Sequence, residues 1–171
     1  GVDTWPDDYE LVAAAFGDSP YATYTKVIHA PAREGEPVSV ILSGMREVNQ
    51  VEICAVNRLR KRIVTFYQTE FTLQEDTLFV DAGTLDVSIS NGVQQQVFNT
   101  DCIGCHGAST FAAANLFLTE GKSEAALVGV PSTRSEAGKL LVTPRSPDES
   151  FLMDVLTHPE AVRHDHVDIL S

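Results

Sequence analysis

Apolar and polar positions in the first 30 residues predict an arm rather than a domain. An apolar run covers residues 9–16 and is interpreted as a short helix. A Gly-Asp-Ser-Pro break at residues 17–20 ends it, and an aromatic stretch that begins at Tyr21 is expected to be extended. We therefore expect residues 1–30 to form an N-terminal arm with one short helix.

Between residues 31 and 91 the pattern changes to short runs in which apolar and polar residues alternate. Alternation of this kind is typical of half-buried strands, and the glycine, asparagine and acidic residues between the runs are typical of turns. About six or seven such strands predict an all-β domain, an immunoglobulin-like sandwich, although the Cys-Trp-Cys signature of true immunoglobulin domains is absent. The expected strands centre on residues 38–42, 51–55, 63–67, 71–73, 78–80 and 85–89, with a turn at Glu75-Asp76.

A helical pattern replaces the strand pattern at residue 92. Asn91 is the expected N-cap of a first helix, with Gln94 reaching back to it. A second helix is expected from Ser123, and a third from Ser146, which is followed by proline and by a glutamate that completes a capping box. We therefore expect residues 92–171 to form a small all-α domain.

The first of these helices leads into Cys102-Ile103-Gly104-Cys105-His106. Two thiols at this spacing, followed at once by histidine, are the attachment motif of c-type haem. In a short helical turn both sulfurs can reach one edge of a porphyrin, and the next imidazole can lie under the iron as its proximal ligand. The sequence therefore predicts one haem c, covalently held by Cys102 and Cys105 and ligated by His106.

Two other interpretations of the motif stay open. A thioredoxin-like dithiol would open a helix after a buried strand, whereas the residues before Cys102 have a helical pattern. A structural zinc site could use Cys102, Cys105 and His106 with His164 or His166 as the fourth ligand, and the spacing does not forbid it. Haem is favoured because a histidine directly after the second cysteine is a specific attachment signal.

The sixth iron ligand is expected from residues 163–168, where two imidazoles and two carboxylates fall in a segment without helical or strand period. A carboxylate there could orient the ring of a ligating histidine. We expect His164 or His166 to bind the iron and leave the choice between them open. A solvated loop and ligation by His29 or a neighbouring chain are the alternatives. The apolar residues expected to line the haem are Val97, Phe98, Phe111 and Leu127.

Residues 92–171 resemble the single-haem cytochrome c domains of bacterial exported proteins and lipoproteins. Three stretches carry the resemblance: the helix and C-x-x-C-H-G motif at 93–107, residues 127–132, and residues 147–152. It implies a small all-α cytochrome c domain and a periplasmic, cell-surface or extracellular location. That family commonly has an axial methionine after the last of these stretches, where this chain has histidines, so two histidine ligands and a low potential are implied. The resemblance does not cover residues 1–91.

Charge narrows the range of partners. The chain has 24 acidic and 12 basic side chains, a net charge of −12, and both halves are acidic. This balance repels phosphate backbones and excludes nucleic acid as an expected partner, while it leaves a basic redox partner open. No apolar run is long enough to span a bilayer. The third cysteine, Cys54, is expected to be a small buried residue.

Together these features predict an electron-transfer protein with a redox partner and no enzymatic activity. One alternative is a haem-bearing structural subunit of an extracellular or surface assembly, in which copies of the chain form a filament-like electron conduit. The other alternative is a zinc-binding structural protein.

Overall fold

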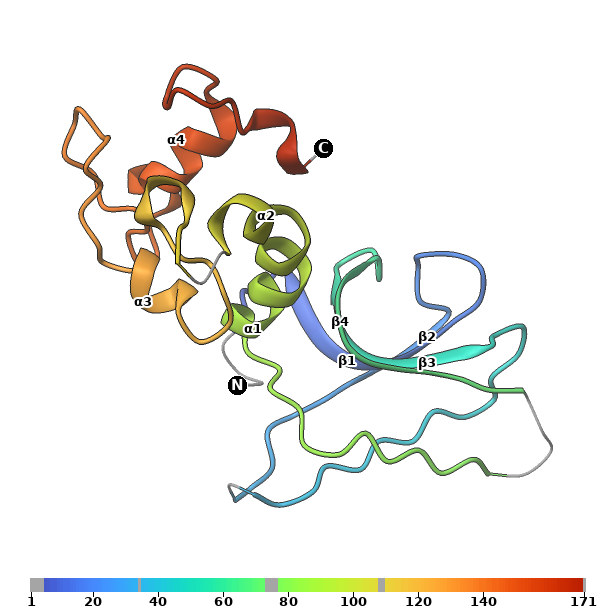
Figure 1. The fold of residues 1–171 in the computed structure, drawn as a ribbon. Helices are drawn as coiled ribbons and strands as arrows, with labels where there is room; N and C mark the ends of the chain where they lie inside the picture. The colour runs from blue at the N-terminus through green and yellow to red at the C-terminus, as the bar shows by residue number, and fades with distance from the viewer. Residues whose placement is uncertain (1–4, 34, 73–76, 108–109, 171) are drawn as a thin grey trace. The chain divides into compact units, whose positions relative to one another are not determined.

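The computed structural model describes residues 5–33, 35–72, 77–107 and 110–170. The chain divides into two compact units, Gly1–Gly92 and Val93–Ser171, which we call the N-terminal and C-terminal units. The first is built on a sheet and the second on short helices joined by loops (Figure 1). Within the described ranges, no helix has the length and apolar character needed to cross a membrane.

The N-terminal unit holds one four-stranded antiparallel sheet in the order β2-β1-β3-β4 (Figure 1). The central pair is in continuous register, with Val12 opposite Cys54 and Ala14 opposite Glu52. Every residue from Leu11 to Phe16 is buried, so the central strand is covered on both faces. The strands are β1 (Tyr9–Phe16), β2 (Tyr24–Val27), β3 (Gln50–Asn57) and β4 (Arg62–Glu70).

The short helix expected in the N-terminal arm is wrong, because residues 9–16 form the central strand β1. An apolar run of this length has no period of two and is compatible with either a buried helix or a strand buried on both faces. Pairing along the whole length of β3 decides the matter in favour of the strand. Residues 9–16 of the expected arm thus lie in the centre of the sheet, and Tyr24–Val27 form its edge strand β2.

The immunoglobulin-like sandwich expected for residues 31–91 is also wrong, because the part of the unit that the structure describes has a single four-stranded sheet. The runs at 51–55 and 63–67 lie in β3 and β4, but those at 38–42, 78–80 and 85–89 form no strand. Of the expected run at 71–73 and the turn after it, Leu73, Glu75 and Asp76 lie outside the described residues.

In two of these runs, 38–42 and 78–80, the physical reason is that apolar side chains stand at neighbouring positions. Ile41 is flanked by valine and leucine and is 80% exposed, and Phe79 lies between leucine and valine and is 91% exposed. Apolar residues on both faces of a segment do not specify which face turns inward, so they fix no pairing register.

A buried carboxylate connects three strands of the sheet. Glu52 on β3 is fully buried and accepts bonds from Arg62 Nε at 2.8 Å and Thr65 Oγ1 at 2.9 Å, both on β4. A second Arg62 nitrogen and the Gln50 amide also donate to it. The Arg62 guanidinium lies 4.2 Å from the centroid of the Phe16 ring on β1. A buried charge is tolerated only when it is paired and hydrogen-bonded in this way.

We expect Glu52→Ala to lower the free energy of unfolding by about 2–4 kcal/mol, because it leaves the partly buried Arg62 cation and the Thr65 hydroxyl without their shared acceptor. Arg58→Ala is the matched control, since it breaks an ion pair with Asp8 in which both side chains are exposed, and it should cost less than about 1 kcal/mol. Urea unfolding followed by circular dichroism measures both. Equal losses would show that burial of the Glu52 pair does not matter.

The Cys54 thiol makes stability depend on alkaline pH. Burial, with a further contribution from the Glu52 charge, raises the pKa of Cys54 from 9.0 to about 12. The fold therefore favours the protonated thiol, and this stabilisation is complete below pH 9 and is lost as the pH rises towards 12. Between pH 8 and pH 10 we expect the wild type to lose about 1 kcal/mol more than Cys54→Ala in urea titrations. Parallel pH profiles for the two proteins would contradict this.

The described residues of the C-terminal unit form no long bundle helices. A continuous helical stretch of 18 residues begins at Ile89, near the end of the N-terminal unit, and ends at His106. The other described helical segments have three to seven residues. The stretch comprises α1 (Ile89–Val93), η2 (Gln94–Cys102) and α2 (Ile103–His106). The shorter segments are η3 (Ala113–Asn115), α3 (Ser123–Leu127), η4 (Pro147–Glu149), α4 (Phe151–Thr157) and η5 (Val167–Leu170).

The small all-α cytochrome c domain expected for residues 92–171 is therefore wrong, since only about 25% of the chain is helical. Gly129, with a φ of +71°, follows the end of α3, and Pro159 follows the end of α4. Extended segments meet between the helices, as at the bridge from Val128 to Val142. The first cap also differs. The helix begins at Ile89, and Ser88 Oγ accepts the Asn91 N–H at 3.2 Å.

Candidate functional site

The two motif cysteines lie where a π-helix passes into an α-helical turn. Cys102 ends η2, and the Ile103 N–H bonds to the Phe98 carbonyl five residues back. Such wide turns are rare and are frequent at functional sites. Cys102 packs against an apolar cluster, whereas Cys105 on α2 is exposed. The cluster consists of buried Phe98, Leu118 and Leu127, with Val97, Leu116, Leu141 and Val142 packed on it.

Gln94 holds the start of η2 in place. Its side chain is buried, and its amide nitrogen donates to the Leu118 carbonyl at 2.9 Å and to Asn99 Oδ1 at 2.7 Å. The Ser123 hydroxyl donates to its amide oxygen. Because a buried amide must be bonded, this network ties η2 to α3 and to the segment that follows η3. The expected capping role of Gln94 is replaced by this inward one.

The His106 ring is fixed by backbone carbonyls. Its Nδ1 lies 3.1 Å from the Ala113 oxygen and 3.3 Å from the Leu116 oxygen. A carbonyl can only accept, so Nδ1 carries the proton and Nε2 keeps its lone pair for a ligand. The chain curls to present these oxygens through Ala114 and Asn115, whose φ angles are +54° and +55°. Two consecutive left-handed non-glycine residues are strained, and such strain is concentrated at functional sites.

A second imidazole faces the first. The ring centroids of His166 and His106 are 6.4 Å apart, and His164 stands edge-on to His166 at 5.0 Å. His166 Nδ1 donates to the His164 carbonyl at 2.6 Å, so its Nε2 is also left with a lone pair. His166 is half-buried, while His164 is exposed. Of His164 and His166, it is His166 whose ring lies next to that of His106.

Burial, and then the charge of Asp101, raise the pKa of the Cys102 thiol above its ordinary value. In the structure as it stands, this environment favours the neutral thiol at Cys102. In the described part of the chain, no group of three or more histidine, cysteine, aspartate or glutamate side chains is arranged to hold a metal ion.

The expected apolar lining is brought together only in part. Val97, Phe98 and Leu127 lie in or against the cluster beside Cys102, whereas Phe111 is 76% exposed. His29 is an exposed residue of the N-terminal unit. Residues that sequence reasoning missed join the cluster from separate loops, and no spacing signal marks them: Leu118, Leu141 and Val142.

Gly107 offers a test of the local geometry. A Cβ at this position would lie 2.4 Å from the Ile103 carbonyl oxygen, so Gly107→Ala forces the end of α2 to shift. We expect it to lower the free energy of unfolding by about 1–3 kcal/mol. Gly104→Ala is the control within the same motif, because a Cβ there meets nothing within 4 Å and alanine favours a helix. Thermal unfolding should therefore show Gly104→Ala unchanged or stabilised; a loss as large as that of Gly107→Ala would contradict this.

The site thus combines a half-buried and an exposed thiol, two imidazoles with free Nε2 atoms and an apolar wall. No protein-family model, curated protein or solved structure matches this chain.

Proposed function

We propose that this chain carries one covalently attached haem c and acts as an electron-transfer protein. Cys102 and Cys105 would hold the haem through thioether bonds, and His106 and His166 would ligate its iron. The observation that carries the proposal is the pair of imidazoles, 6.4 Å apart between ring centroids, that stands beside a C-x-x-C-H motif.

The separation of the two rings fits a shared metal. Two imidazoles bound on opposite sides of one metal, each at about 2.0 Å, have ring centroids roughly 6 Å apart. Both Nδ1 atoms are bonded to backbone carbonyls, which is the usual way in which a protein fixes the tautomer of a metal-binding histidine. His166 is proposed as the ligand rather than His164 because His166 is half-buried and its ring lies against that of His106.

The thiol environments also fit thioether attachment. A thioether carries no charge, so the burial that disfavours a Cys102 thiolate does not disfavour it. Cys102 lies on the apolar cluster, which can exclude water from one side of a ring, and exposed Cys105 leaves the other side of the motif accessible for electron exchange. The motif's resemblance to single-haem bacterial cytochromes c supports the same assignment.

The residues suggest the properties of the carrier. When bound, the haem supplies a one-electron couple. Two histidine ligands would leave the iron no open position, which favours outer-sphere electron exchange over catalysis. Carbonyls that accept the Nδ1–H bonds make both imidazoles stronger donors, which lowers the reduction potential.

The proposed partners and location follow from charge and from haem chemistry. Residues 93–171 hold ten acidic side chains against five basic ones, so a redox partner with a basic face is proposed. Covalent haem attachment normally takes place outside the cytoplasm, which supports an exported protein at the periplasm, cell surface or beyond.

Absorption spectra of the oxidised and reduced protein, together with its intact mass, test the haem. We expect a Soret band, the mass of one haem, and no near-infrared band of methionine-ligated ferric iron. A colourless protein of unmodified mass would refute the proposal.

The ligand is tested with two matched variants. His166→Ala should convert the low-spin ferric spectrum to a high-spin one, because it removes the sixth ligand. His164→Ala should leave it low-spin, since its imidazole is not the one that faces His106. The reverse result would assign the sixth ligand to His164. A low-spin spectrum in both variants would show that neither histidine is the ligand.

A further inference from the structure

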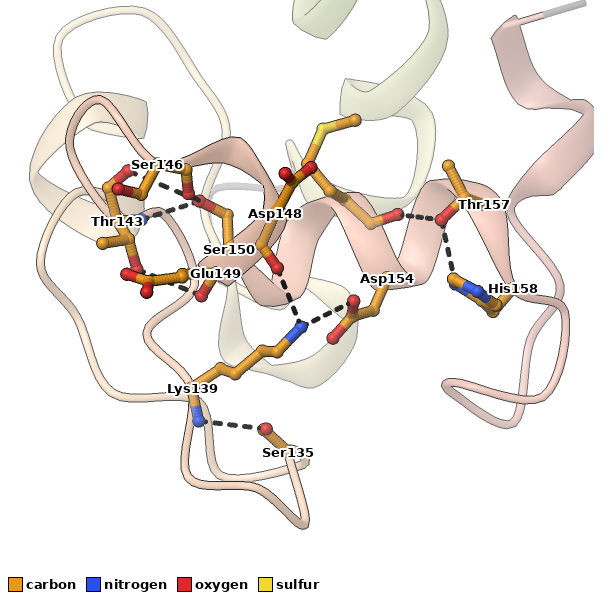
Figure 2. Close-up of polar contacts among 11 residues, drawn as sticks. Ser135, Lys139, Thr143, Ser146, Asp148, Glu149, Ser150, Asp154, Thr157 and His158 are labelled. Atoms are coloured by element: carbon orange, nitrogen blue, oxygen red, sulfur yellow. Dashed lines mark hydrogen bonds and ion pairs between the residues drawn. The ribbon is translucent and has the colours of Figure 1, made fainter.

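Ser150 makes the loop before α4 rigid. This serine is 3% exposed, and its hydroxyl donates to the Ser146 carbonyl at 2.9 Å and accepts the Thr143 N–H at 2.9 Å (Figure 2). The Thr143 hydroxyl in turn donates to the Glu149 carbonyl at 3.1 Å. A loop closed by three such bonds keeps one backbone conformation.

Arg145 lies inside this loop in a conformation that disfavours a side chain. Its φ is +63°, a region normally occupied by glycine or asparagine. Its side chain is exposed and makes no ion pair with any described residue. A strained arginine without a partner in a rigid loop points to a role for its charge.

The loop borders a cavity of about 250 Å³ whose side walls are apolar. Val142 belongs both to this cavity and to the apolar cluster on which Cys102 packs. Arg145 is the only charged residue among those that line the cavity, which are Val142, Thr143, Arg145, Ser146, Pro147, Ser150, Leu152 and Met153.

We propose that this cavity receives an edge of the haem and that Arg145 binds one of its carboxylates. The inference rests on the proposed haem attachment. An apolar wall with one cation at its rim matches a ligand that is apolar in the ring and anionic at one edge. The volume is below the roughly 300–1,000 Å³ of pockets that hold whole ligands, so the cavity can take only part of the group.

A cation at this position would change the reduction potential of the haem. A positive charge near the iron disfavours the ferric state, so Arg145 raises the reduction potential above the value that two histidines alone would set. Removal of the charge should lower the equilibrium constant for reduction by two- to tenfold, and tenfold is about 59 mV for a one-electron couple.

Four variants of the haem-loaded protein separate this electrostatic role from a structural one. Arg145→Gln and Arg145→Gly should both lower the potential in spectroelectrochemical titrations. Arg145→Gly should at the same time raise the thermal midpoint, because glycine removes the strain at φ +63°. Arg145→Lys should keep most of the potential. Arg134→Gln is the matched control, since Arg134 is an exposed cation of the same unit that does not line the cavity.

The outcomes distinguish this inference from the haem proposal. A protein without haem refutes both. A haem-loaded protein whose potential is the same in Arg145→Gln, Arg145→Gly and the wild type overturns the role of Arg145 and leaves the haem in place. Equal decreases in Arg145→Gln and Arg134→Gln would show a general charge effect and would also overturn it.

Discussion

The bonding of the His106 ring to backbone carbonyls is the interaction around which the segments near the C-x-x-C-H motif are arranged. The Nδ1–H of His106 needs the carbonyls of the η3 turn, and the turn offers them only because two residues adopt left-handed backbone conformations. The chain then returns to α2, where the Leu118 N–H bonds to the His106 carbonyl at 2.8 Å. Gln94 holds that returning segment through its own bond to Leu118. The strained turn is therefore held by the hydrogen bonds of His106 on one side and by those of Leu118 on the other.

In the N-terminal unit, hydrogen bonds likewise fix a buried carboxylate. Glu52 is buried among strands, and four donor contacts from three side chains satisfy it. Among the described residues, every buried side-chain nitrogen or oxygen has a hydrogen-bond partner. Complete satisfaction is what makes a buried polar network specify one arrangement of its strands or loops.

Short helices and long loops let segments far apart in the chain meet in the C-terminal unit. The loops bring the imidazole of His166 to that of His106, and they hold Arg145 in a left-handed turn that lines a cavity together with Val142. Under the proposed function, the ligands set a low potential, Arg145 moderates it, and the cluster keeps water away. Each contribution comes from a different segment, which lets the potential be tuned without disturbing the attachment motif.

The sequence alone determined the local chemistry of this protein. The C-x-x-C-H motif, the paired histidines near residue 165 and the strands at β3 and β4 all follow from residue type and spacing over a few positions. Tertiary structure decided the rest. The apolar run at β1 suits a helix as well as a strand until β3 pairs with it. The runs at 38–42 and 78–80 carry apolar residues on both faces and so define no pairing register. The approach of His166 to His106 and the positions of Leu118 and Val142 depend on contacts between residues far apart in the chain, and no local pattern encodes such contacts.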